Sequence, residues 1–237
     1  MDARHRALRH VDVHARGCAR PAPASAHGTA VASLLVGRSG AFHGVLPQAS
    51  LFTADVTCAD AAVDAIADAL AWMVREQVPV INISLVGAAN RTLERVVRAV
   101  TTRGHVIVAA VGNDGPAAPP LYPAAYAGVV GVTGVDSRRR VLPEALQGPQ
   151  VMFAAPGAAL AVASGDGFSA ARGTSFAAPL VAGLLALRLR EAGRDAAAQA
   201  IGELTREAID LGAPGRDPVY GLGLLAERER IDPVALR

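Results

Sequence analysis

The chain has 237 residues, of which 51% are hydrophobic and 19% charged, and its formal net charge is +2 at pH 7. This length allows one α/β domain with a substantial core, and the small charge gives no indication of nucleic-acid binding. The sequence contains no lysine, which excludes a P-loop lysine, a Schiff-base lysine and a Ser-Lys dyad. No apolar run reaches the roughly 18 residues that a membrane-spanning helix needs.

Apolar periodicity predicts an alternation of strands and helices along the chain. Strands are expected at residues 11–14, 49–56, 79–85, 105–111, 129–135 and 150–154, and helices at residues 27–37, 60–76, 92–103, 174–192 and 196–209. Residues 16–25 are expected to form a loop. Because the strands are almost continuously apolar, they predict a mostly parallel sheet with helices on both faces, which is a three-layer α/β fold. Neither a repeat nor a linker interrupts the pattern, so residues 1–237 are expected to form a single domain.

The first residues of the chain carry no apolar signal core, so the sequence as it stands predicts a cytoplasmic location. If a signal and a pro-region precede it, a secreted or periplasmic location is expected instead. The two cysteines, Cys18 and Cys58, are too few for a four-cysteine zinc site. We expect them to be free or joined in a single bridge.

The most informative stretch is Gly173-Thr174-Ser175-Phe176-Ala177-Ala178-Pro179. A helix is expected to begin near Thr174, which places Ser175 in the first turn, where free N–H groups and the helix dipole favour negative charge. That position suits a serine that attacks a carbonyl next to an oxyanion site. Pro179 has no N–H for the carbonyl of Ser175, so this turn is predicted to be irregular. For Gly-Thr-Ser alone, a capped core helix with an incidental serine explains the residues equally well.

Two further residues, a histidine and an asparagine, are candidates for a functional site. His27 is expected at the N-terminal edge of the helix at residues 27–37, and Asn113 lies in a tight turn directly after the strand at residues 105–111. Taken singly, a histidine there is a surface or capping residue, and an asparagine is a turn former. However, ligands bind beyond the carboxyl ends of the strands in such sheets, which is where Asn113 stands.

The strings around His27, Asn113 and Ser175 together resemble, in order, the motifs of the subtilisin-like serine peptidases. The resemblance runs from about residue 2 to about residue 228, although Ala30 and Ser33 stand where a histidine and a glycine are common. It implies a serine endopeptidase in which Ser175 is the nucleophile of an acyl-enzyme and His27 the general base. Asn113 and the N–H of Ser175 would stabilise the oxyanion.

The same resemblance implies a polypeptide substrate in extended conformation, bound by strand pairing. The residues that it assigns to substrate binding are Ser84, Leu85, Val86, Gly87, Ala109, Ala110, Val111, Gly112 and Thr174. We expect a monomer that binds no nucleic acid and needs no cofactor. Calcium often stabilises members of this family, but no acidic ligand loop indicates it here, and no metal ligands are assigned.

The family's aspartate, which orients the histidine, has no counterpart in the sequence. Only 26 residues precede His27, and none forms an Asp-Thr-Gly or Asp-Ser-Gly motif. Of the two acidic candidates, Asp12 lies in an expected strand and has neighbours that do not match, while the string that begins at Asp2 resembles the segment just after the motif. One hypothesis is that the chain is N-terminally incomplete and that the first strand and its aspartate lie upstream of Met1. The other is that the chain is complete and is an inactive, peptide-binding pseudoenzyme.

The spacing of the residues argues against three other kinds of site. Ser175 is not part of the G-x-S-x-G motif of α/β-hydrolases. The glycines at residues 128–134 have the wrong spacing for a nucleotide-binding loop, and His5, His10 and His14 are too loosely spaced for a metal site.

Overall fold

The computed structural model describes residues 1–17, 24–56 and 62–236. The predictions for Cys18 and Cys58, part of the loop at residues 16–25 and the start of the helix expected from Asp60 lie outside the described residues. Among the described residues, no helix combines the length and apolar character needed to cross a membrane.

Four parallel strands form the centre of the fold, in the order β5-β6-β7-β8. They are β5 (Val80–Ile83), β6 (Val106–Ala110), β7 (Val129–Val135) and β8 (Val151–Pro156). A second, two-stranded parallel sheet pairs β1 (Val13–Arg16) with β4 (Leu51–Ala54). No described strand pairs β4 with β5, so the parallel strands fall into two separate sheets.

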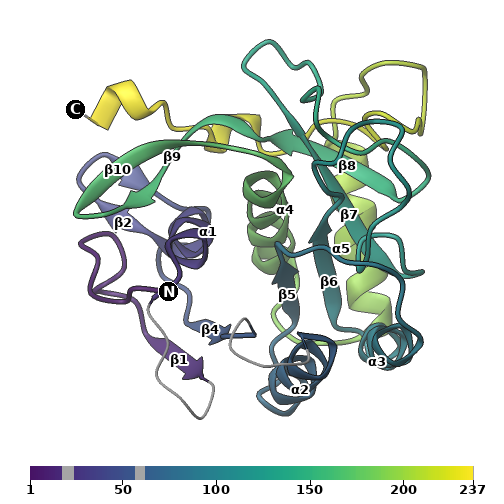
Figure 1. Cartoon of the computed structure of the whole chain (residues 1–237), viewed down its shortest axis with the longest axis horizontal. Helices are drawn as coiled ribbons and strands as arrows, with labels where there is room; N and C mark the ends of the chain where they lie inside the picture. The colour runs from purple at the N-terminus through teal and green to yellow at the C-terminus, as the bar shows by residue number, and fades with distance from the viewer. Residues whose placement is uncertain (18–23, 57–61, 237) are drawn as a thin grey trace.

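Helices cover both faces of the central sheet, as the apolar strands predicted (Figure 1). One layer contains α2 (Ala62–Arg75) and α3 (Arg91–Thr102), and the other contains α1 (Ala26–Val36), α4 (Thr174–Arg188) and α5 (Arg194–Glu207). The reason is that alternate side chains of β6 point to opposite faces of the sheet. Val106, Val108 and Ala110 pack in the core with α4 and α5, while Ile107 and Ala109 pack with α2 and α3. The three-layer α/β prediction is therefore confirmed.

Several element boundaries differ from the sequence prediction. The first strand begins at Val13 instead of residue 11, and α4 ends at Arg188 instead of continuing to residue 192, because Leu189 is extended. The helix predicted to begin at residue 196 begins at Arg194, where the extended backbone of Gly193 precedes it.

Two antiparallel hairpins were not predicted. The longer one pairs β9 (Ala158–Ser164) with β10 (Gly167–Arg172), and the shorter one pairs β2 (Arg38–Ser39) with β3 (Phe42–His43). The longer hairpin closes at Gly165-Asp166, with Gly165 at a φ of +55°, a turn composition typical of hairpins. Its strands are rich in alanine, which is a weak strand former, and this masked the alternation of Leu160 and Val162. Two short 3₁₀ helices, Glu227–Glu229 and Pro233–Leu236, lie near the C-terminus.

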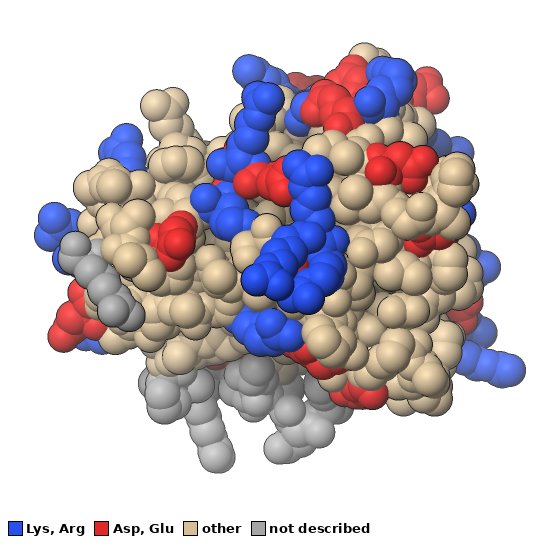
Figure 2. Space-filling model, turned by 90° about the horizontal axis from the view of Figure 1, so that it is seen from above, with Lys and Arg blue, Asp and Glu red and all other residues tan. Residues whose placement is uncertain are grey.

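Charges of opposite sign lie next to each other on the molecular surface. On the face shown in Figure 2, arginine side chains gather near the centre with acidic side chains beside them. Within the run at residues 138–140, Arg139 forms an ion pair with Glu227 at 2.6 Å and Arg140 with Asp136 at 2.7 Å. These arginines are consequently neutralised by defined partners.

Candidate active site

Ser175 lies in the first turn of α4, as the sequence predicted. The helix begins after Gly173, which has a φ of +132° that a side chain would strain, and which donates its N–H to the carbonyl of Gly157 at 2.8 Å. Ser175 is half-buried at this helix end. Its N–H is one of the first helical donors, which have no carbonyl within the helix to bond.

The helix is unbroken through Pro179, which corrects the prediction of an irregular turn. Pro179 cannot donate to the carbonyl of Ser175, but the hydroxyl of Ser84 donates to that carbonyl at 2.8 Å. The hydroxyl of Ser175 in turn lies 3.5 Å from the carbonyl oxygen of Ser84. Ser84, directly after β5, therefore replaces the missing helical donor and fixes the turn that carries Ser175.

Asn113 follows β6 and is oriented by the same helix end. Its Oδ1 accepts the N–H of Thr174 at 3.0 Å, and because an N–H can only donate, this contact fixes which amide atom faces the helix. Asn113 is exposed, and its Nδ2 group is the part of the amide that can donate. Thr174 itself is fully buried, and its hydroxyl accepts the N–H of Gly112 at 3.3 Å. Thr174 thus joins α4 to the loop after β6 from inside the protein.

His27 is the second residue of α1, a helix whose N-cap Ser25 accepts the N–H of Gly28 at 3.0 Å. The imidazole ring lies against the ring of Phe176, the residue after Ser175, with 5.5 Å between the ring centroids. Partial burial lowers the pKa of His27 below its usual value, because burial disfavours the charged imidazolium. The neutral form, which can accept a proton, is therefore favoured.

Neither acidic residue near the start of the chain is bonded to His27. The carboxylate of Asp2 accepts from Arg4, and that of Asp12 accepts from Ser50 and His14. Within the described part of the chain, no cluster of three or more His, Cys, Asp or Glu side chains could hold a metal ion.

The residues that the sequence assigned to substrate binding fall into exposed and buried groups. Leu85 and Val86 are 38% and 45% exposed and form the open edge beyond β5. Both main-chain groups of Gly87 are already bonded to Tyr122, at 2.9 Å each. Ala109, Ala110 and Val111 are buried, so their side chains pack within the core. Gly112 has a φ of +107°, and a Cβ there would lie 2.6 Å from Leu121.

His27 also lines a depression of about 300 Å³. Phe176 lines it together with Val162, Ala163 and Ala170 of the β9–β10 hairpin. The sequence did not lead to these lining residues because the hairpin was not predicted from it. The Gly165-Asp166 turn between alternating apolar residues was the signal that could have found it.

Comparison with known proteins places this arrangement in a family. A model described as the Subtilase family matches residues 14–223. The chain is 32% identical to Subtilisin BL from Lederbergia lenta over 229 residues, which cover 91% of this chain and 84% of that protein. It is 28% identical to the Minor extracellular protease Epr from Bacillus subtilis over 205 residues, which cover 84% of this chain but only 32% of that protein.

Solved structures agree with the sequence comparisons. The self-cleaved protease domain of PatA has a TM-score of 0.80 and 27% identity, with 94% of this chain and 89% of that chain covered. MycP1 with its N-terminal propeptide removed has a TM-score of 0.73 and 27% identity, with 91% and 80% covered.

Proposed function

The chain belongs to the Subtilase family, and we propose on this premise that it hydrolyses peptide bonds as a serine endopeptidase. One observation carries the proposal: the end of α4 gathers the hydroxyl of Ser175, the oriented amide of Asn113 and the ring of Phe176 that touches His27. The residues proposed as nucleophile, oxyanion donor and base come from three distant parts of the sequence, and these contacts support the proposal.

In the proposed reaction, the hydroxyl oxygen of Ser175 attacks the substrate carbonyl and its proton passes to the neutral imidazole of His27. The lowered pKa keeps that imidazole unprotonated near neutral pH. Rotation of Ser175 away from the carbonyl of Ser84, a contact of 3.5 Å, frees the hydroxyl for attack. The imidazolium then protonates the leaving amine, and water releases the acyl group by the reverse sequence.

The tetrahedral intermediate carries an oxyanion that needs preorganised donors. The N–H of Ser175 and the Nδ2 group of Asn113 supply them. Because Thr174 holds Oδ1 of Asn113, the amide does not have to reorient when the charge develops. Asn113 is also uncharged at every relevant pH, so this donor is not lost by titration.

The exposed edge at Leu85 and Val86 is the proposed contact with an extended polypeptide. Main-chain hydrogen bonds to these two residues would hold the peptide, and its side chains would alternate between the protein and solvent. Gly87 is not expected to take part, because Tyr122 already uses its main-chain donor and acceptor.

We further propose that the protein acts outside the cytoplasm. The name of the Bacillus subtilis relative, an extracellular protease, supports this location. Fractionation of the source organism followed by immunodetection tests it, and recovery in the cytoplasmic fraction alone would contradict it.

The activity is tested by incubating the chain with an unstructured protein such as unfolded casein and separating the fragments. The matched control is Ser175→Ala, which removes only the hydroxyl oxygen. Faster cleavage by the unaltered chain supports the proposal. Equal rates for the two proteins reject it and favour a peptide-binding protein without hydrolytic activity.

A further inference from the structure

Two segments, residues 84–87 and residues 111–113, follow the neighbouring strands β5 and β6. Past the strands they do not pair with each other through their glycines. Both main-chain groups of Gly87 bond to Tyr122, at 2.9 Å each. Those of Gly112 bond to the start of α4 and to the loop before β8. What lies between the two segments is therefore decided by the residues around Tyr122.

The dipeptide Leu121-Tyr122 connects the two segments. Tyr122 holds Gly87 through the two main-chain hydrogen bonds. The side chain of Leu121 lies against Gly112 on the other side, so that a Cβ on this glycine would be 2.6 Å from Cδ1 of Leu121. Gly112 has a φ of +107°, a conformation that strains any residue with a side chain. The side chain of Leu121 therefore covers a position where the chain has no side chain of its own.

Contacts on both sides hold this dipeptide in place. The ring of Tyr122 lies 4.4 Å from the ring of Tyr126, measured between centroids. The hydroxyl of Tyr126 accepts the N–H of Asn90 at 2.8 Å and donates to the carbonyl of Asn90 at 2.9 Å. Leu121 packs against the buried core that contains Leu146. Because a side chain packed in this way loses contacts when it moves, Leu121 is not free to swing aside at no cost.

Leu121 lies close to the proposed reacting groups, because Gly112 directly precedes Asn113. When Ser175 attacks a peptide carbonyl and Asn113 holds the oxyanion, the residue that carries this carbonyl lies next to Gly112. We call it the acyl residue of the substrate. The leaving amine lies on the other side, towards His27, which protonates it. The side chain of the acyl residue therefore meets Leu121 between the two segments.

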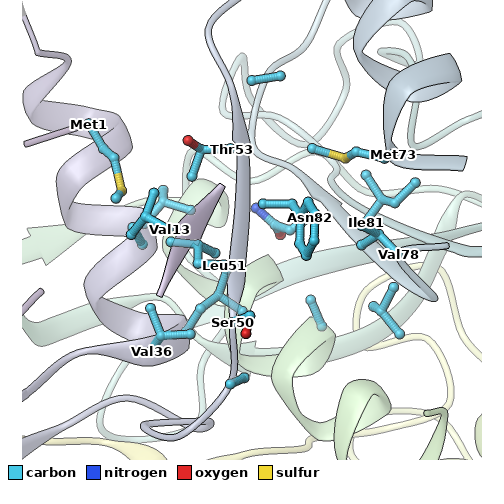
Figure 3. Close-up of a pocket in the computed structure, with 18 of the residues that line it drawn as sticks. Met1, Val13, Val36, Ser50, Leu51, Thr53, Met73, Val78, Ile81 and Asn82 are labelled. Atoms are coloured by element: carbon cyan, nitrogen blue, oxygen red, sulfur yellow. The ribbon is translucent and has the colours of Figure 1, made fainter. Parts of the chain in front are cut away.

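A large cavity near β5 is a different space. It has a volume of about 970 Å³ and lies on the β4 side of β5, with Leu51 and Asn82 among its walls (Figure 3). Leu85 also lines it, but Gly112 and Leu121 do not. The volume of this cavity consequently adds no room beside Gly112.

We propose that Leu121 restricts the acyl residue of the substrate to a small side chain, namely that of glycine, alanine or serine. This size restriction rests on the proposed peptidase activity and specifies which peptide bonds the site accepts. A leucine or phenylalanine side chain has to displace Leu121 from its packing against the core, which is unfavourable. A methyl or hydroxymethyl group needs no such displacement.

Cleavage of matched peptides tests the size restriction. The peptides share one sequence and differ at a single residue, which is Ala, Leu or Phe, and mass spectrometry identifies the bond that is cut after it. The measured quantity is the ratio of kcat/KM for the Ala peptide to that for the Phe peptide. This ratio does not depend on how much of a preparation is folded, because both peptides meet the same protein. We expect a ratio of at least about tenfold, since a misfit of even one methylene changes specificity by about 10–200-fold.

Substitutions at Leu121 test the cause of the preference. Leu121→Ala should lower the ratio by about tenfold or more, and Leu121→Val, which keeps most of the packing, should lower it by less. The matched control is Leu187→Ala, which removes the same atoms from a side chain of α4 that is 54% exposed, and it should leave the ratio unchanged. If the unaltered chain cuts after Leu or Phe as fast as after Ala, or if Leu121→Ala leaves the ratio unchanged, the restriction is rejected and the peptidase proposal stands.

Binding separates the size restriction from the proposed activity. Ser175→Ala binds the peptides without cutting them, and the fluorescence anisotropy of labelled peptides gives their Kd values. We expect the Ala peptide to bind at least about tenfold more tightly than the Phe peptide, and Leu121→Ala in the same background to remove this difference. If the unaltered chain cuts no peptide faster than Ser175→Ala does, but the difference in Kd is present, the peptidase is rejected and the restriction is supported. If in that case the Kd values are equal, or neither peptide binds, both are rejected.

Discussion

The hydroxyl of Ser84 donates to the carbonyl of Ser175 at 2.8 Å, although 91 residues separate the two in the sequence. The bond exists because Pro179, four residues beyond Ser175, has no N–H to donate. A residue at the end of β5 thus completes the first turn of α4. The proposed nucleophile is therefore held by the sheet as well as by its own helix.

We predict that Ser84→Ala lowers the free energy of unfolding by about 1–3 kcal/mol, because it leaves the carbonyl of Ser175 without its donor in a partly buried site. Cleavage of casein should fall with it, since the turn that positions Ser175 loosens. Urea denaturation and initial rates measure the two effects. Ser50→Ala, which removes an exposed hydroxyl bonded to Asp12, is the control and should change neither by much.

A double-mutant cycle tests whether Ser84 stabilises this turn because Pro179 has no N–H. Pro179→Ala restores a helical N–H to the carbonyl of Ser175, so Ser84→Ala should cost clearly less in that background. A cost that is the same in the presence and absence of Pro179 would show that the hydroxyl acts in another way.

Asn113→Ala should reduce kcat by about 10²–10³-fold, because it removes one oxyanion donor. Asn113→Asp is the sharper variant. It keeps an oxygen for the N–H of Thr174, but its second oxygen repels the oxyanion instead of donating to it. We therefore expect the Asp variant to be at least as impaired as the Ala variant while retaining its fold by circular dichroism. Near-normal turnover in either variant would remove Asn113 from the mechanism.

His27 makes both activity and stability depend on pH. Its pKa in the folded protein is lowered by burial, so kcat/KM should reach half its maximum below the usual histidine value of about 6.5. Between the lowered pKa and about 6.5 the unfolded chain binds more protons than the folded chain, so stability decreases as the pH falls through this range. His27→Gln should abolish this part of the pH dependence in urea titrations. Identical pH profiles for both proteins would contradict it.

Two glycines within helices allow a matched comparison of how an added methyl group affects packing. A Cβ at Gly183 in α4 would lie 2.6 Å from the Cβ of Val45, whereas a Cβ at Gly202 in α5 would meet only the guanidinium of Arg206, at 3.6 Å. Gly183→Ala should therefore destabilise the protein by about 1–3 kcal/mol. Gly202→Ala should stabilise it by up to about 1 kcal/mol, since alanine favours a helix interior. Thermal unfolding measures both, and destabilisation by the change at Gly202 would contradict the packing described for α5.

The layers of the fold and the three distant motifs can be predicted from the amino-acid sequence alone. Continuous apolar strands such as β6 must be covered on both faces, and this was readable from residues 105–111 without any coordinates. The start of α4 at Thr174 was also predicted correctly, and in the structure Gly173 alone separates this helix from β10. In both cases the cause is local: side-chain period and backbone preference act over a few residues.

The contacts between these elements become apparent only in three dimensions. The structure shows that Ser84 supplies the donor that Pro179 lacks and that Thr174 is buried. It also shows that the main-chain N–H and C=O of Gly87 are both hydrogen-bonded to Tyr122. It also revealed the β9–β10 hairpin, which lines a depression together with His27. Each of these depends on which groups meet across long sequence separations. The local sequence shows that a polar group needs a hydrogen-bond partner, but the packing of distant segments determines which partner it finds.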